Sequence, residues 1–128
     1  MPTLIFIALG GSFGALSRYG LTNWFNRVVN SPFPWGTLVI NLTGSFLIGF
    51  FFILFDRSVL PAPYRNLVSV GFLGAYTTFS TYSLETINLL REGQWRLASS
   101  NILVSNILGI VLVILGMYCA KLLLKTLR

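Results

Sequence analysis

The sequence contains no histidine, one cysteine and three acidic residues among 128 positions. Without histidine there is no imidazole for a zinc or haem site, and none for a Ser-His-Asp triad. Cys119 lies in an apolar run, where a buried or lipid-facing thiol is expected rather than a disulfide or a metal ligand. The sequence therefore excludes these histidine-based chemistries.

Charged side chains are also scarce, at 9% of the residues, whereas 55% are hydrophobic and 15% aromatic. This balance is typical of a bilayer protein and not of a soluble domain. The net charge of +6 comes from basic residues that stand singly, mostly near the ends of apolar segments. They are expected to anchor helices at the membrane interface, and no nucleic-acid partner is predicted.

Hydropathy divides the chain into four apolar segments joined by short polar loops. Each segment approaches the ~20 residues that a helix needs to cross ~30 Å of hydrocarbon. We expect a single all-α transmembrane domain over 1–128, with spans at roughly 3–25, 34–55, 66–90 and 96–124. The first segment lacks a basic n-region and a small-residue cleavage site, so it is expected to be a retained helix.

Positive charge is almost evenly divided between the two predicted membrane faces. With four spans, both termini share one face, which carries Arg57, Arg65, Lys121, Lys125 and Arg128. The other face carries Arg27, Arg91 and Arg96, with Arg18 as a further candidate. So small a bias gives little preference for either insertion direction. We therefore predict dual topology, with two identical chains pairing as an antiparallel homodimer.

Two predicted helices carry small polar residues at four-residue spacing. Thr37, Asn41 and Ser45 share one face of the second span, and Asn101, Ser105 and Gly109 share one face of the fourth. Such faces either pair with neighbouring helices as structural glue or line a wet path.

The third span is interrupted by a stretch rich in glycine and hydroxyl groups, Gly71 to Glu85. We expect the helix to break between Gly74 and Thr78, where freed carbonyls are suited to a hard cation such as Na⁺. Beyond the break, Thr78, Thr81 and Glu85 form a polar stripe beside an aromatic stripe of Phe79 and Tyr82.

This combination favours a path for a small anion over one for a cation. Aromatic rings have positive edges, and hydroxyl and amide groups supply donors, whereas a cation path needs a ring of acids. Glu85 is the only candidate for a membrane-embedded carboxylate. Arg18, about two thirds along the first span, has two interpretations that stay open: an interfacial snorkelling residue, or a cation that draws anions into a wet vestibule.

Three ordered motifs resemble those of the Fluc fluoride channels, also called the CrcB family. Residues 74–82 read GAYTTFSTY, like the family's third-helix signature. Residues 10–19, GGSFGALSRY, and 36–46, GTLVINLTGSF, resemble its first and second helices. The resemblance covers essentially the whole chain.

The resemblance implies an antiparallel dual-topology homodimer with two fluoride pores and a central Na⁺ held by backbone carbonyls. The carbonyl positions match Gly74 and Thr77. The positions along or near the fluoride path match Phe79, Tyr82, Asn41, Ser80, Thr81, Thr37, Glu85, Ser105 and Arg18. Two residues depart from the family pattern: Tyr82 stands where phenylalanine is usual, and Asn101 where tyrosine is frequent.

The function implied is passive, fluoride-selective export from the cytoplasm across the inner membrane of a bacterial cell. Two other classes stay open from the residues alone. A small multidrug exporter also has four spans, but it needs a glutamate in the first span, which this chain lacks. A non-transporting subunit is the second alternative, if the polar stripes only pair with each other.

Overall fold

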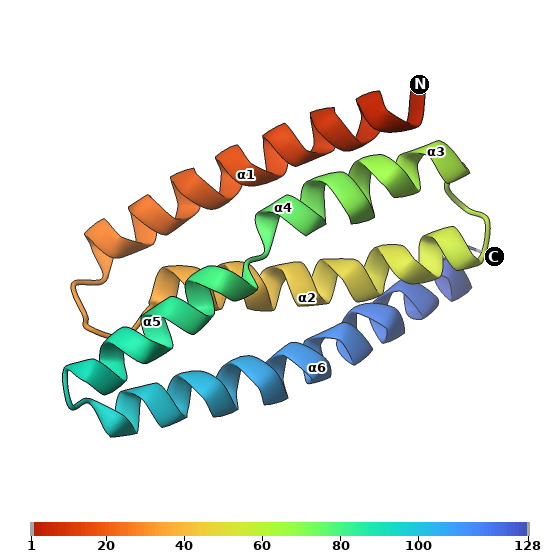
Figure 1. The fold of residues 1–128 in the computed structure, drawn as a ribbon. Coiled ribbons are helices and arrows are strands. Elements are labelled where there is room, and N and C mark those ends of the chain that lie inside the picture. The colour runs from red at the N-terminus through yellow and green to blue at the C-terminus, as the bar shows by residue number, and fades with distance from the viewer. Residues whose placement is uncertain (1, 128) are drawn as a thin grey trace.

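The computed structural model describes residues 2–127, and every regular element in this range is helical. Three helices are long and apolar enough to cross a membrane: α1 (Pro2–Val28), α2 (Trp35–Asp56) and α6 (Trp95–Thr126). The remaining crossing, third in chain order, consists of shorter helical pieces, and none of these pieces alone reaches spanning length. Figure 1 shows these segments running side by side. The expected all-α membrane architecture with a broken third segment is confirmed.

The broken crossing contains four consecutive helical pieces. They are α3 (Ala62–Arg65), the π-helical η1 (Asn66–Leu73), α4 (Gly74–Tyr76) and α5 (Phe79–Arg91). Only Thr77 and Thr78 leave the helical region, with ψ angles of 154° and 119°. The predicted break over 74–78 is therefore too wide, because Gly74 is itself helical at φ −62° and ψ −35°. Extended backbone suits the two β-branched threonines.

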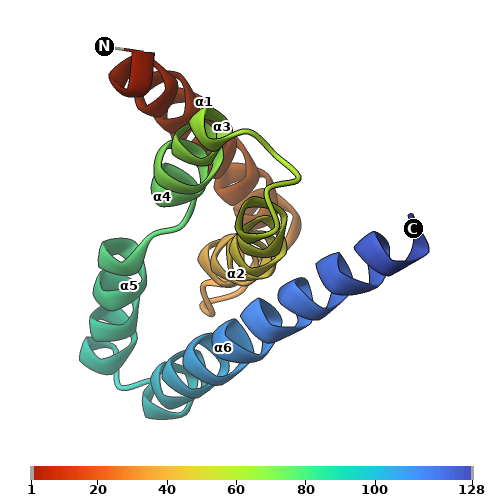
Figure 2. The same cartoon turned by 90° about the vertical axis from the view of Figure 1, so that its right-hand side faces the viewer.

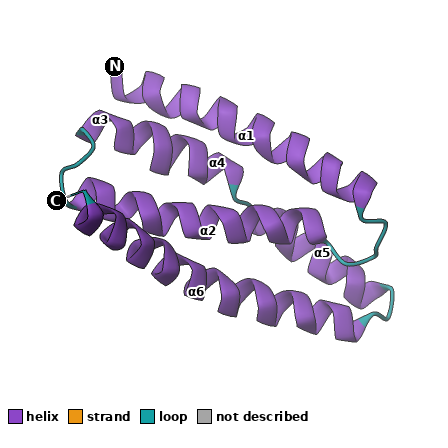
Figure 3. Ribbon diagram, turned by 180° about the vertical axis from the view of Figure 1, so that it is seen from behind, coloured by secondary structure: helices purple, strands orange, loops and turns teal. Residues whose placement is uncertain are grey.

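Both termini lie at the same end of the molecule (Figure 1), as an even number of crossings requires. The connection from α2 to α3 lies at that end, and the α1–α2 and α5–α6 connections lie at the other, which Figure 3 shows from behind. The break between α4 and α5 falls near the middle of the bundle's length in both views. It therefore lies about midway along the crossing, away from both ends of the bundle.

The helices pair in two close contacts, α1 along η1 and α4, and α2 along α6 (Figure 2). Glycines form both. A Cβ at Gly14 would overlap the carbonyl of Phe72, and a Cβ at Gly116 would overlap the carbonyl of Phe46. Small residues let helix backbones touch in lipid, where no hydrophobic drive brings them together.

The buried apolar core lies where α2 meets the broken crossing. Ile40, Leu73 and Tyr76 are its fully enclosed members. The hydroxyl of Tyr76 is 2.9 Å from the Thr43 hydroxyl, so this phenol is satisfied inside the core. The core therefore fixes the end of α4 against α2, immediately before the break.

We expect Gly116→Ala to lower the free energy of unfolding by about 1–3 kcal/mol, because its methyl group would push α6 away from the Phe46 carbonyl. Gly109→Ala, two turns away on the same helix, is the matched control, since its Cβ would meet only the Ser45 hydroxyl at 3.7 Å. Thermal unfolding in detergent, followed by circular dichroism, measures both. Equal melting temperatures for the two variants would contradict close α2–α6 packing.

Candidate functional site

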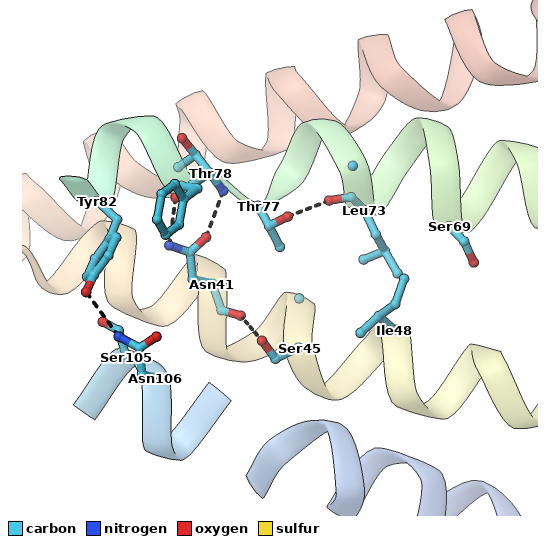
Figure 4. Close-up of a pocket in the computed structure, with 13 residues that line it drawn as sticks. Asn41, Ser45, Ile48, Ser69, Leu73, Thr77, Thr78, Tyr82, Ser105 and Asn106 are labelled. Atoms are coloured by element: carbon cyan, nitrogen blue, oxygen red, sulfur yellow. Dashed lines mark hydrogen bonds between the residues drawn. The ribbon is translucent and has the colours of Figure 1, made fainter. Parts of the chain in front are cut away.

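A cavity of about 350 Å³ lies beside the break, between α2, the broken crossing and α6 (Figure 4). Most of its polar lining groups are hydroxyls and amides, and no acidic or basic side chain lines it. The lining residues are Asn41, Gly44, Ser45, Ile48, Ser69, Leu73, Gly74, Thr77, Thr78, Phe79, Tyr82, Ser105 and Asn106. The chemistry of this lining is that of a neutral, donor-bearing site in a membrane.

The side-chain amide of Asn41 forms hydrogen bonds with both backbone groups of Thr78 (Figure 4). The Thr78 N–H donates to Oδ1 of Asn41 at 2.8 Å, and Nδ2 of Asn41 donates to the Thr78 carbonyl at 3.0 Å. One side-chain amide thus replaces two helical partners that the break removes. The second hydrogen on Nδ2 is left for another acceptor.

Arg18 contacts the backbone beside the break. Its Nε donates to the carbonyl of Ala75 at 3.0 Å, and its side chain is half-buried. The guanidinium therefore satisfies a second backbone group that the break frees. Neither of the two interpretations drawn from the sequence included this contact, and four further N–H donors of the same group remain for other acceptors.

Phe79 and Tyr82 line the cavity side by side, as their three-residue spacing predicts. Their ring centroids are 5.6 Å apart and their planes are inclined by 47°. Phe79 is 78% exposed in the single chain, so almost nothing in this chain covers its ring. The Tyr82 hydroxyl accepts a hydrogen bond from Nδ2 of Asn106 at 3.1 Å.

The polar stripe of α2 meets α5 at a second point. The Thr37 hydroxyl donates to Oε1 of Glu85 at 2.8 Å, and Thr37 is only 4% exposed. This pair does not line the cavity. Since Thr37 precedes Asn41 by one turn and Glu85 follows Phe79, the pair continues the polar strip toward the α1–α2 end of the bundle.

The predicted site residues separate into two groups. Those that line the cavity are Asn41, Phe79, Tyr82, Ser105, Gly74 and Thr77. Those that lie outside it are Arg18 at the break, Ser80 and Thr81 in the first turn of α5, and the Thr37–Glu85 pair. The first group contains both aromatic residues and both carbonyl positions that the sequence singled out.

Seven of the 13 lining residues were not predicted as site residues, and three of these seven, Gly44, Thr78 and Asn106, make contacts that shape the cavity. Thr78 caps α5 by accepting from the N–H of Thr81 at 3.3 Å, and Asn106 binds the Tyr82 hydroxyl. Gly44 leaves room for Thr77, whose Cγ2 would overlap a Cβ at that position. An asparagine in a membrane helix was the available signal for Asn106, because lipid disfavours an unpaired amide.

The carbonyls of Gly74 and Thr77 lie at the break and line the cavity, where a cation could reach them. Within residues 2–127, no side chain and no N–H outside the helices donates to either oxygen, whereas the carbonyls of Leu73, Ala75 and Thr78 accept such hydrogen bonds. Gly74 is exposed in the single chain, so its backbone is accessible to a ligand. Two unpaired carbonyl oxygens suit a hard cation, which prefers oxygen ligands.

Known proteins resemble the chain along nearly its whole length. The family model described as CrcB-like protein, Camphor Resistance (CrcB), matches residues 5–117. A fluoride-specific ion channel FluC of Magnetococcus marinus is 47% identical over 120 residues, which are 93% of this chain and 98% of that protein. The protein of the same name from Salinibacter ruber is 48% identical over 124 residues, or 97% of this chain and 93% of the relative.

A third relative, the fluoride-specific ion channel FluC of Hahella chejuensis, is 44% identical over 125 residues, or 97% of this chain and 98% of its own length. These three alignments cover 93–97% of this chain. The resemblance inferred from the three motifs is confirmed, and this chain belongs to the CrcB-like family of membrane proteins.

Proposed function

We propose that the protein is a fluoride-selective channel that lets fluoride leave the cytoplasm passively across the inner membrane of a bacterial cell. The observation that carries this proposal is the cavity at the break, which combines aromatic rings with amide and hydroxyl groups and contains no charged side chain. The full-length relatives, which are named as fluoride-specific channels, support the same function. No catalytic step is involved.

Fluoride moves by exchanging its water for protein donors. Asn41, Phe79 and Tyr82 line the cavity, so we infer that the free Nδ2 hydrogen of Asn41 and the positive edges of the two rings contact the ion. Next to it, the hydroxyls of Ser80 and Thr81 belong to the first turn of α5, whose N-terminus favours an anion. No acidic side chain lines the cavity to draw cations along the path, and chloride is rejected because it is larger than a dehydrated fluoride.

Residues beside the cavity extend the path. Arg18 places a positive charge near its wall while it holds the Ala75 carbonyl, so it raises the local concentration of anions. The Thr37–Glu85 pair and the hydroxyl of Ser105 add polar surface along α2, α5 and α6. We infer that the ion passes along this strip between the cavity and the α1–α2 end of the bundle.

We expect Phe79→Ile to slow fluoride efflux from loaded liposomes roughly tenfold, because isoleucine fills similar space but has no positive ring edge to contact the ion. The 78% exposure of Phe79 means that this chain's fold does not depend on its ring. A fluoride-selective electrode measures the rate, and a chloride electrode on the same sample measures selectivity.

Phe13→Ile is the matched control for this measurement, since Phe13 is also largely exposed, at 65%, but lies on α1 and does not line the cavity. It should retain the original efflux rate. If the unsubstituted protein releases chloride as fast as fluoride, the proposed function is wrong. If Phe79→Ile leaves the fluoride efflux rate unchanged, Phe79 does not line the path of the ion.

We further propose that the working unit is an antiparallel dimer of identical chains with two pores. The break supports this proposal, because lipid does not tolerate irregular backbone that faces hydrocarbon. In the single chain, Gly74, Phe79 and Ser80 are all exposed there. A second, inverted copy would cover this surface and would bring its own break to the same depth.

The distribution of charge supports opposite orientations of the two copies. Among residues 2–127, the end that holds the termini carries Arg57, Arg65, Lys121 and Lys125, and the other end carries Arg27, Arg91 and Arg96. Arg18 no longer counts toward either end, because it lies at the break. The remaining bias is too small to select one direction of insertion.

We expect an impermeant thiol reagent to label about half of the copies from either side of the membrane, since neither orientation is favoured. The reporter is Lys125→Cys near the termini, in a Cys119→Ser background, because the native thiol is exposed. Glu92→Cys at the opposite end is the matched reporter and should also label about half. Labelling of all Lys125→Cys copies from one side would rule out dual topology.

We propose, finally, that the carbonyls of Gly74 and Thr77 hold a Na⁺ ion at the dimer interface. The ion would supply positive charge that neutralises backbone oxygens left unpaired by the break. Its role is structural, and two copies of the break would together offer more oxygen ligands than one chain does.

We expect the melting temperature of the purified dimer to rise with the concentration of Na⁺, because a ligand that binds only the folded state stabilises it by mass action. N-methylglucamine chloride at matched ionic strength is the control, since this large organic cation does not fit between two carbonyls. Identical melting curves in the two salts would contradict the sodium site.

A further inference from the structure

Most hydroxyl groups around the cavity donate their protons to the protein itself. Ser45 donates to the Asn41 carbonyl at 2.8 Å, and Thr77 donates to the Leu73 carbonyl at 2.9 Å. Thr78 donates to the Thr81 hydroxyl at 3.1 Å, and Ser105 donates to Oδ1 of Asn101 at 3.3 Å. A hydroxyl group has one proton, so these four oxygens have none left for an anion.

Tyr82 differs from these four because its hydroxyl acts as an acceptor. Nδ2 of Asn106 has two hydrogens; one is donated to the Ile102 carbonyl at 2.7 Å and the other to the Tyr82 oxygen at 3.1 Å. The Ile102 carbonyl fixes this orientation, since a flipped amide would set two oxygens against each other. Because Asn106 can only donate at this point, the phenolic proton of Tyr82 has to point elsewhere.

The phenolic proton is free to be donated into the cavity. Tyr82, Ser105 and Asn106 all line it (Figure 4), and no acceptor within residues 2–127 takes the phenolic proton. We therefore propose that the Tyr82 O–H is a direct ligand of the permeating anion, and that Asn106 is the positioning residue that keeps this donor turned toward the ion. This inference rests on the proposed function and assigns a ligand within the same path.

The chemistry of both groups suits this role. A hydrogen bond to an anion is roughly twice as strong as one between neutral groups. A hydroxyl that already accepts a hydrogen bond is polarised by it and donates more strongly, so Asn106 both orients the phenol and strengthens it. The α5–α6 contacts stiffen the arrangement, because Nδ2 of the buried Asn101 donates to the Thr86 hydroxyl at 3.0 Å, which in turn donates to the Tyr82 carbonyl at 2.8 Å.

A double-mutant cycle on efflux from liposomes tests the proposal. Tyr82→Phe keeps the ring and its edge but removes the donor, so we expect the fluoride concentration at half-maximal rate to rise roughly tenfold. Asn106→Leu leaves the phenol without its orienting bond, so the same concentration should rise by a smaller factor. In the Tyr82→Phe background, Asn106→Leu should cause no further change, because there is no hydroxyl left to position.

Tyr118→Phe is the matched control, since Tyr118 lies near the end of α6 and outside the cavity, and it should leave the half-maximal concentration unchanged. Thermal unfolding of every variant in detergent separates loss of fold from loss of a ligand. If Asn106→Leu has the same effect with and without the phenol, Asn106 does not act through Tyr82.

An unchanged half-maximal concentration in Tyr82→Phe would overturn the ligand assignment while leaving the channel intact. If the original protein shows no fluoride efflux at all, the proposed function fails, and this inference fails with it. The two failures are thus distinguished by the unsubstituted protein alone.

Discussion

The pairing of the Asn41 amide with the backbone of Thr78 is the interaction on which the rest of the structure depends. A helix broken at mid-membrane leaves peptide groups that lipid cannot satisfy, and each one costs several kcal/mol (~2–7) when left unpaired. Asn41 satisfies the N–H and the carbonyl of Thr78, and Arg18 satisfies the carbonyl of Ala75. These contacts make a stable break possible in the middle of a membrane crossing.

The same solution decides what the break can bind. Because Asn41 and Arg18 satisfy some backbone groups and not others, the carbonyls of Gly74 and Thr77 remain unpaired, on the exposed side of the single chain. The chain resumes as α5, which turns Phe79 and Tyr82 into the cavity. The free carbonyls and the aromatic wall of the cavity are therefore two consequences of one interruption. They lie next to each other, and neither requires a charged side chain in the cavity.

Periodicity and motif order predicted much of this arrangement. The four crossings, the interruption of the third, the α2 stripe of Thr37 and Asn41 and the neighbouring rings of Phe79 and Tyr82 all depend on local spacing, which a sequence displays directly. The predicted width of the break was wrong, because glycine permits a bend without requiring one, and Gly74 stays helical. The contacts of Arg18 and Asn106 were not predicted. Their partners, Ala75 and Tyr82, lie on other helices, and spacing along one helix does not show which residues of two helices meet.

The sequence by itself determined that this is a membrane protein of four crossings, that its third crossing cannot be a continuous helix, and which residue types are available for an ion path. These properties follow from composition and from the fixed geometry of a helix. Only the tertiary structure decided which polar groups are already paired and which remain free, because a hydrogen bond between helices depends on where distant segments meet. That distinction separates Asn41, which supports the break, from the free carbonyls of Gly74 and Thr77 and from the donor of Tyr82.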